Sequence, residues 1–392
     1  MSRVRGSQVR AGTGLSRSAD AFEAGQAAAI DSLAPLAGEP PSLVLVFCTP
    51  RYDLPRLLAG VRAATGEALL VGCTGSGELV GGQHLGFGGG VGVLAMTAGP
   101  YRFGVASASD LVGDLDEAGR SLARAGRAQA GPSPHAAALL LTDSLLGDLQ
   151  QFAQGVYRVT GPQVAIVGGA AGDEQRFVAS SLFHGDAVLR KGALVLWIAS
   201  DRPLRVVTRH GWAPTGPHHL VTRAEDTEIL ELGGRAAAEV YREQLGLPEG
   251  LSPDAFWASA VSHPFGLLQP DGSHVIRTAR AATPRGGLII HGCVPQVGSS
   301  VQIMRGDCEA LLGVVEEVVG AALSGRPDAA VLLTFSCAAR ALLLGHRAPE
   351  EAVRLQSAAG AVPVFGFHCC GEFARTSGVL ATHNATLTAM AL

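Results

Sequence analysis

An internal repeat limits the folds open to this chain more than any other property of its sequence. When the sequence is shifted by 95 residues, residues 43–78 align without a gap on residues 138–173. Eight aligned positions are identical: Leu45/Leu140, Asp53/Asp148, Leu54/Leu149, Gly60/Gly155, Val61/Val156, Thr65/Thr160, Gly66/Gly161 and Gly77/Gly172. Thr49/Ser144 and Glu78/Asp173 are conservative matches. Similarity at a fixed offset indicates one supersecondary unit that is used more than once.

Both copies predict the same order of elements. In the first copy, an apolar run at 43–47 is typical of a buried strand, and the apolar spacing of 53–64 is that of a helix. Two further strands are predicted at 68–71 and 90–96. The second copy gives the corresponding ranges 138–141, 148–159, 164–167 and 193–199. Asp53 and Asp148 stand at the start of the predicted helices, and aspartate is a preferred N-cap residue. The unit is therefore β-α-β-β, with copies at about 43–96 and 138–199.

A third copy is predicted near the C-terminus. It has strands at 330–335 and 362–367 and a helix at 349–357. Its turn at 366–372 has the same G-x-x-x-x-G-E frame as residues 72–78. A degraded fourth unit is expected over 256–304, with strands at 275–282 and 287–292.

These units predict an α/β fold in which repeated β-α-β-β units form mixed sheets covered by helices, in two lobes. A first lobe is expected at 21–235 and a second at 236–392. Residues 1–20 carry four arginines among serine and glycine, and we expect them to be a disordered tail.

Composition excludes several classes of protein. Hydrophobic residues make up 47% of the chain and charged residues 16%, which indicates a folded protein with large buried sheets. The net charge of −4 and the scattered arginines argue against nucleic acid as a partner. Neither a signal peptide nor a run of about 18 apolar residues is present, so we expect a cytoplasmic protein without a membrane span. Seven cysteines fit reduced thiols in that compartment.

Several motifs, taken in order, resemble the FIST family of bacterial sensory proteins over residues 40–392. The motifs lie at 71–78, 168–173, 183–185, 210–212, 221–224, 337–340, 366–372 and 383–387. The first lobe then resembles a FIST N region and the second a FIST C region.

The resemblance implies a ligand-sensing role. FIST regions accompany histidine kinases, chemotaxis receptors or cyclic-di-GMP enzymes, and amino acids are among their suggested ligands. One branch is described as haem-binding nitric oxide sensors. No kinase, receptor or cyclase segment occurs in this sequence, so we expect a separately encoded partner of one of these kinds.

The Gly-rich turns are the first candidate site, because such turns expose backbone N–H groups to an anionic ligand. Glu78 and Glu372 could bind a ligand amine. The alternative is structural: the glycines serve only tight turns and close packing. The Walker motif is not met, because Glu follows the second glycine, and the glycine order of a dinucleotide fold is absent. The predicted ligand-binding residues are Gly75, Gly77, Glu78, Gly169, Asp173, Arg340, Gly371 and Glu372.

Arg340 is predicted to hold a ligand carboxylate or phosphate, since a guanidinium forms two parallel hydrogen bonds with such groups. The alternative is an internal ion pair, with Glu372 as the expected partner. Arg277, in an apolar strand, has a similar interpretation.

A second candidate is the turn His368-Cys369-Cys370, where the family commonly has an aromatic and small polar residues. Thiolates and imidazole suit zinc, copper or redox chemistry. Adjacent residues of a strand point to opposite faces, however, which argues against one shared ion. No cysteine lies in a catalytic signature. For haem, His184 and His210 are candidates, and the absence of C-x-x-C-H excludes covalent attachment.

The sequence therefore predicts a non-enzymatic sensor of an amino-acid-like metabolite, without a required cofactor. A haem-based nitric oxide sensor, or a thiol or metal redox protein using residues 368–370, is the alternative.

Overall fold

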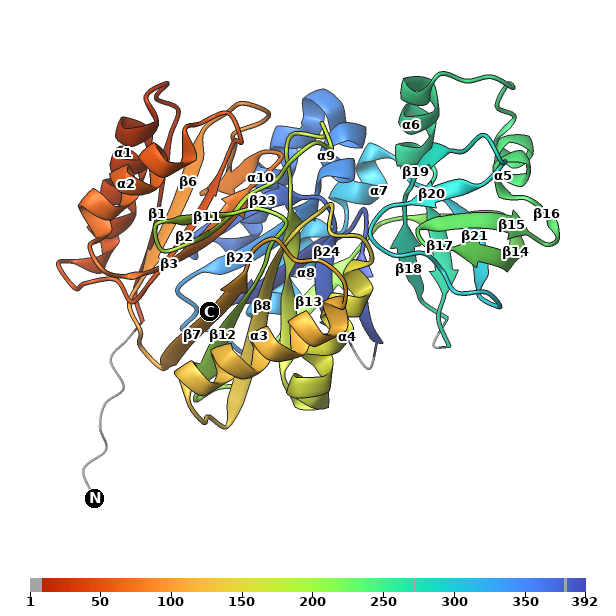
Figure 1. The fold of residues 1–392 in the computed structure, drawn as a ribbon. Coiled ribbons are helices and arrows are strands. Elements are labelled where there is room, and N and C mark those ends of the chain that lie inside the picture. The colour runs from red at the N-terminus through yellow and green to blue at the C-terminus, as the bar shows by residue number, and fades with distance from the viewer. Residues whose placement is uncertain (1–8, 271, 377–378) are drawn as a thin grey trace.

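The computed structural model describes residues 9–270, 272–376 and 379–392. Its strands form three six-stranded sheets and one eight-stranded sheet. The three smaller sheets form one body, with red to orange, yellow to green, and blue segments in Figure 1. The eight-stranded sheet forms a separate lobe at the right of that view.

The first repeat builds its sheet around a parallel pair, β2 (Leu43–Cys48) and β3 (Leu69–Thr74), joined by α2 (Leu54–Thr65). The Asp53 carboxylate caps α2 by accepting the Arg56 N–H. β6 (Val91–Met96) pairs antiparallel with β2 on one side. β1 (Ala11–Ser16) then pairs with β6, and α1 (Ala21–Leu33) follows β1.

The second and third repeats have the same order of strands. In the second, β12 pairs antiparallel with both β8 and β7, and β8 pairs parallel with β9. Its elements are β7 (Tyr101–Ala108), α3 (Leu115–Ala130), β8 (His135–Asp143), α4 (Leu149–Thr160), β9 (Ala165–Ala171) and β12 (Ala193–Ser200). In the third, β26 lies between β13 and β22, and β22 pairs parallel with β23. Its elements are β13 (Val206–Arg209), α8 (Val315–Leu323), β22 (Leu332–Cys337), α9 (Ala338–Leu344), α10 (Ala348–Ala359), β23 (Val364–Cys369) and β26 (Leu387–Ala391).

Each repeat gives a hairpin to the sheet of another repeat. The hairpin of the first repeat pairs with β23, that of the second with β3, and that of the third with β9. The exchange is cyclic, so no repeat completes its sheet alone. The hairpin strands are β4 (Glu78–Val80) and β5 (Gln83–His84), β10 (Leu182–His184) and β11 (Ala187–Leu189), and β24 (Glu372–Thr376) and β25 (Val379–His383).

The separate lobe is an insertion between β13 and α8 of the third repeat. All its described strand pairs are antiparallel. Its elements are β14 (Ala213–Glu225), β15 (Glu228–Leu232), β16 (Arg235–Ala236), α5 (Ala237–Leu245), α6 (Pro253–Ser262), β17 (Phe265–Leu268), β18 (His274–Arg277), β19 (Ala279–Ala282), β20 (Leu288–Ile290), β21 (Ser300–Arg305) and α7 (Cys308–Leu312). We call this segment, 213–312, the inserted lobe.

The fold class is confirmed: mixed sheets covered by helices, in two lobes. The prediction of a degraded fourth β-α-β-β unit is wrong, because this region has no parallel strand pair among the described residues. Strands do occur at 274–282 and 288–290. The prediction of a disordered tail is wrong for residues 11–16, because these residues form β1 and pair with β6. Residues 1–8 lie outside the described residues. The boundary predicted between residues 235 and 236 falls inside the inserted lobe, because strands on both sides of it belong to the eight-stranded sheet.

The main core lies between the three sheets of the larger body. Phe47 packs against Phe365 and Phe367 from the sheet of the third repeat. The helices cover the outer faces of the sheets in three further apolar clusters, one for each repeat. No helix in the described part of the chain is long and apolar enough to cross a membrane.

Candidate functional site

The three Gly-rich turns meet where the three repeats meet. The N–H of Ser76 donates to the carbonyl of His368, at 2.9 Å, which joins the first and third repeats. The N–H of Gly172 donates to Thr74, and that of Cys370 donates to Ala170, each at 2.9 Å. Backbone hydrogen bonds therefore link all three turns into a closed ring.

The glycines of these turns serve close packing. A Cβ added at Gly172 would lie 2.6 Å from Oγ of Ser76, and one at Gly169 would lie 2.7 Å from Cβ of Cys369. One at Gly75 would lie 3.0 Å from the ring of Phe367. Gly77 and Gly371 have φ values of 116° and 121°, which side chains rarely tolerate. Their surroundings explain these glycines without a ligand.

Three acidic side chains occupy the same position in the three turns, and each has a different role. The Asp173 carboxylate accepts the backbone N–H groups of Phe177, Val178 and Ala179, at 2.6 to 3.0 Å. It therefore shapes the loop that follows it.

Glu372 is fully buried and its carboxylate is well satisfied. Oε2 accepts the N–H and the hydroxyl of Thr386 at 3.1 and 2.7 Å, and Oε1 accepts the thiol of Cys369 at 3.1 Å. Burial raises its pKa to about 7. Glu78 is also fully buried, but neither of its oxygens has a partner among the described residues. Burial raises the pKa of Glu78 well above its ordinary value.

The prediction that Arg340 is open to a ligand is wrong. The guanidinium is fully buried and makes two hydrogen bonds to Oε2 of Glu351, at 3.0 and 2.6 Å. The internal partner is therefore Glu351 and not Glu372. Arg277 is also buried, and its Nη1 donates to the carbonyls of Ile276 and Thr382.

The side chains of residues 368–370 do not converge. The ring of His368 meets that of His84 edge-on at 4.9 Å, whereas Sγ of Cys369 donates to Glu372. Cys370 faces Gln175 instead, at 3.7 Å. Within the described residues, no group of three or more His, Cys, Asp or Glu is arranged to hold a metal ion. The strand alternation noted in the sequence keeps these three side chains apart.

The two haem candidates have different hydrogen-bond partners. Nδ1 of His184 is 2.8 Å from Oγ of Ser107, and Nδ1 of His210 accepts the N–H of Trp212. Burial lowers the pKa of His210 to about 4.

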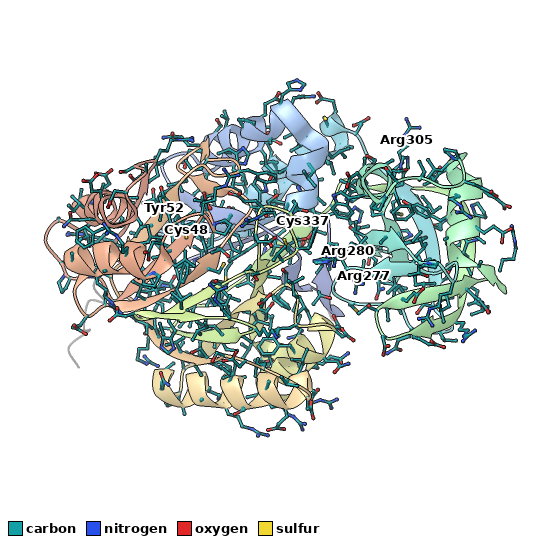
Figure 2. All side chains as sticks on the ribbon, turned by 45° about the horizontal axis from the view of Figure 1, so that its top comes forward. Cys48, Tyr52, Arg277, Arg280, Arg305 and Cys337 are labelled. Atoms are coloured by element: carbon teal, nitrogen blue, oxygen red, sulfur yellow. The ribbon has the colours of Figure 1, made fainter. Side chains whose placement is uncertain are left out.

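A pocket lies beside the ring of turns, between the larger body and the inserted lobe. We call it the junction pocket. The larger body supplies strand ends, turns and the start of α9, and the inserted lobe supplies a helix and two loops. Its lining residues are Gln175, Phe177, Trp257, Thr278, His291, Cys337, Ala338, Ala339, Cys369, Cys370 and Asn384. Figure 2 shows Cys337 at this junction, with Arg277 and Arg280 on the side of the inserted lobe.

Most of the surface of the junction pocket is apolar, but its polar groups are specific. The hydroxyl of Thr278 is buried and has no hydrogen-bond partner among the described residues. The backbone N–H of Thr278 donates to Oδ1 of Asn384 at 3.3 Å. Nε2 of His291 is 2.7 Å from the carbonyl of Cys370, so this nitrogen carries the proton. Burial lowers the pKa of His291, so the ring is neutral at pH 7 and Nδ1 is its acceptor.

The loop over the pocket has a strained backbone. Glu174, Gln175 and Phe177 have φ values of 60°, 63° and 53°, which are uncommon for residues with a side chain. The carboxylate of Glu174 holds the loop in place by accepting the hydroxyl of Thr49 at 2.7 Å and Nε of Arg51 at 2.9 Å. Strained residues that are held in this way cluster at ligand-binding and switch regions.

Phe177 is the aromatic cover of the junction pocket. Its ring meets those of Trp257 and His291 edge-on, with centroids 5.8 and 5.7 Å away. The guanidinium of Arg280 lies 4.7 Å from the centroid of the Phe177 ring. The enclosed volume is about 20 Å³, which is room for about one water molecule. Haem, a far larger group, does not fit this pocket.

The sequence indicates the turns but does not indicate most of the pocket. Gln175, Phe177, Trp257, Thr278 and His291 were not candidates, and Cys369 and Cys370 were named for another chemistry. The motifs at 337–340 and 383–387 were the available signals, because they contain Cys337, Ala338, Ala339 and Asn384. The contribution of the inserted lobe had no signal, because that lobe does not belong to the repeat.

Comparison with known proteins finds two family domains in the chain. Residues 42–235 match the FIST N domain and residues 237–375 match the FIST C domain. An uncharacterized protein of Mycobacterium bovis is 32% identical over 237 residues, or 57% of this chain, and the chain spans 59% of the length of that relative. An uncharacterized protein of Mycobacterium tuberculosis is 27% identical over 96% of this chain and 98% of its own.

Among solved structures, a cyanuric acid hydrolase from A. caulinodans covers 98% of both chains at 10% identity, with a TM-score of 0.38. A likeness at that level supports no argument about activity. The two domain matches follow each other over residues 42–375, and the chain belongs to the FIST family.

Proposed function

We propose that this FIST protein is a sensor that binds a small polar ligand in the junction pocket and signals through a separate partner. The main support is that the larger body and the inserted lobe line one pocket. In this pocket, the buried hydroxyl of Thr278 has no hydrogen-bond partner among the described residues. An unsatisfied buried polar group costs about 1–3 kcal/mol, which a ligand with a matching group would recover.

The polar groups around the pocket can form hydrogen bonds with the amine and carboxyl groups of an amino-acid-like metabolite. Thr278 offers a hydroxyl, Gln175 and Asn384 offer amides, and His291 offers an acceptor nitrogen. These groups both donate and accept, and none of them carries a charge at pH 7. They suit a small ligand with several polar groups and an apolar body, because the remaining walls are alanine, thiol and aromatic.

Phe177 is expected to move when the ligand enters. The closed pocket holds about one water molecule, so any larger ligand must displace one wall. The strained backbone at Glu174, Gln175 and Phe177 would be relieved by such a movement, so we expect this loop to be the wall that moves.

The junction explains how a bound ligand could change the protein. The hydrogen bonds across it include His291 to the carbonyl of Cys370, the Leu149 N–H to Gly292, and Arg277 to Thr382. A ligand that contacts both the larger body and the inserted lobe adds contacts to these hydrogen bonds. If it binds one position of the inserted lobe more tightly than another, it shifts the equilibrium between the two positions. The partner would be a histidine kinase, a chemoreceptor or a cyclic-di-GMP enzyme, as the family suggests.

Binding is better supported than catalysis. Burial raises the pKa of Cys337 and Cys369 well above the ordinary value and that of Cys370 to about 12. The thiolate is the reactive form of cysteine, so these thiols are protonated and weakly nucleophilic at pH 7. Redox sensing remains the second candidate, because all three thiols line the junction pocket.

A thermal-stability screen with amino acids and related metabolites tests the proposal. A ligand present at about 100 times its dissociation constant stabilises the folded state by about 2.7 kcal/mol. Thr278→Val keeps the shape of the side chain but loses the hydroxyl, and we expect it to reduce that stabilisation. Thr222→Val, in the same lobe but outside the pocket, is the control. A screen without any stabilising ligand would count against the proposal.

A further inference from the structure

A second cavity lies on the other side of the loop that covers the junction pocket. Its volume is about 560 Å³, within the usual range for small-molecule sites. We call it the arginine groove. Its lining residues are Pro50, Tyr52, Asp53, Leu54, Pro55, Arg176, Ala179, Ser181, Val188 and Arg190. Figure 2 places Tyr52 well away from Cys337 and the junction pocket.

Residues of one loop line both cavities. Gln175 and Phe177 line the junction pocket, whereas Arg176 and Ala179 line the arginine groove. The loop therefore forms a wall between two separate cavities.

Two positive charges on the groove lack acidic partners. Arg176 donates from Nε to the backbone carbonyl of Asp173 at 3.0 Å, and the guanidinium of Arg190 has no hydrogen bond to any described residue. Neither guanidinium forms an ion pair in the described part of the chain. By contrast, nearby Arg51 and Arg62 are paired with Glu174 and Asp186.

A largely buried serine also lines the groove. Ser181 is 5% exposed, and its backbone is fixed by hydrogen bonds with Thr74. Ser181 lines the groove, and its hydroxyl has no hydrogen-bond partner among the described residues.

The remaining walls are mostly apolar, and the exceptions are Tyr52 and the acidic residue Asp53. The hydroxyl of Tyr52 donates to the carbonyl of Ser18 at 2.7 Å, so this residue offers its ring. The carboxylate of Asp53 accepts the N–H of Arg56, as the cap of α2. Pro50, Pro55 and Val188 complete an apolar surface next to the two charges.

We propose that the arginine groove binds a small molecule through an oxyanion group, either a phosphate or a carboxylate. Guanidinium groups form strong, oriented hydrogen bonds with both groups. Arg176 and Arg190 would hold the oxyanion, Ser181 would donate a further hydrogen bond, and the apolar wall would contact the rest of the molecule. This site is separate from the junction pocket and does not depend on the function proposed for it.

Calorimetric titration of the full chain with inorganic phosphate, and separately with succinate, tests the proposal. We expect saturable binding of at least one probe, and about tenfold weaker binding in Arg176→Gln and in Arg190→Gln. Ser181→Ala should weaken binding less. Tighter binding of phosphate would assign a phosphate-bearing ligand, and tighter binding of succinate a carboxylate.

Two controls separate the groove from general charge effects and from the junction pocket. Arg305→Gln removes an exposed arginine of the inserted lobe and should leave the affinity unchanged, as should Thr278→Val. Failure of both probes to saturate, or equal affinity in the wild type and the Arg176→Gln/Arg190→Gln double variant, would overturn the proposal.

Discussion

The turns of the first and third repeats place a buried glutamate at the same position, but only the third repeat gives that glutamate partners. Glu372 accepts three hydrogen bonds from Thr386 and Cys369, whereas Glu78 accepts none from described residues. The third repeat also buries an ion pair, Arg340 with Glu351. The comparison shows that a repeat sets the course of the backbone, while each copy acquires its own polar surroundings.

The second repeat shows the same separation between backbone and chemistry. β4 begins at Glu78 and β24 begins at Glu372, but β10 begins at Leu182, nine residues after Asp173. The shorter Asp173 side chain caps this extra loop instead. The loop then supplies walls to two cavities, so the largest departure from the repeat lies at the candidate sites.

The largest effect is expected from Arg340→Met, which breaks the polar network of the third repeat. It leaves Glu351 as an unpaired buried charge, and such losses cost about 3–5 kcal/mol of unfolding free energy. Urea unfolding measures it. Arg235→Met removes exposed ion pairs with Glu239 and Glu243 instead, and should cost far less because solvent screens these charges. A similarly small loss of unfolding free energy in both variants would contradict the difference expected between the buried and the exposed ion pairs.

The next effect is a pH dependence that comes from Glu372. Its pKa is about 7 in the folded protein, against an ordinary value of 4.5, so the folded state binds more protons than the unfolded chain between these values. Its contribution to stability is complete below pH 4.5 and is lost as the pH rises to about 7. The change amounts to about 3 kcal/mol. The stability difference between the wild type and Glu372→Gln should follow this course, and a difference independent of pH would contradict it.

A smaller effect is expected from Thr386→Val, which makes the third repeat more like the first. The Glu372 carboxylate loses the hydroxyl donor, at a cost of about 1–3 kcal/mol. Its pKa should rise further, because the hydrogen bonds from Thr386 lower it. Denaturant unfolding at several pH values measures both changes. Thr386→Ser keeps the hydroxyl and should remain close to the wild type.

The smallest effect is expected from Glu78→Gln. Burial raises the pKa of Glu78 well above its ordinary value, which favours the neutral form, and no described residue donates to its carboxyl group. The neutral amide should therefore change the unfolding free energy by no more than about 1 kcal/mol at pH 7. A large loss in denaturant unfolding would show that Glu78 has an essential partner.

The sequence predicted the repeated units well because their apolar periods and caps are local properties. Asp53 and Asp148 do begin α2 and α4, and the parallel strand pairs occur in all three repeats. The exchange of hairpins could not be predicted, because strand pairing between repeats depends on contacts far apart in the sequence. The inserted lobe interrupts the third repeat after β13, and no repeated residue marks that point.

The candidate site was harder to predict than the fold. Arg340 has the residue type of a ligand-binding group, but its partner, Glu351, lies eleven residues away on α10 and faces it only in the folded chain. Thr278 and His291 are ordinary residues in sequence, and their importance comes from the lack of a partner or from a hydrogen bond across the junction. Burial and orphaned polar atoms are properties of the structure alone.

Fluorescence of Trp257 tests the central claim, a ligand in the junction pocket, most directly. Trp197→Phe and Trp212→Phe remove the other two tryptophans, which lie outside the pocket. Titration of this variant with a ligand from the stability screen should change the emission in a saturable way, and Thr278→Val should weaken that response. A stabilising ligand that binds this variant without altering the emission of Trp257, or binds equally well after Thr278→Val, would contradict a site in the junction pocket.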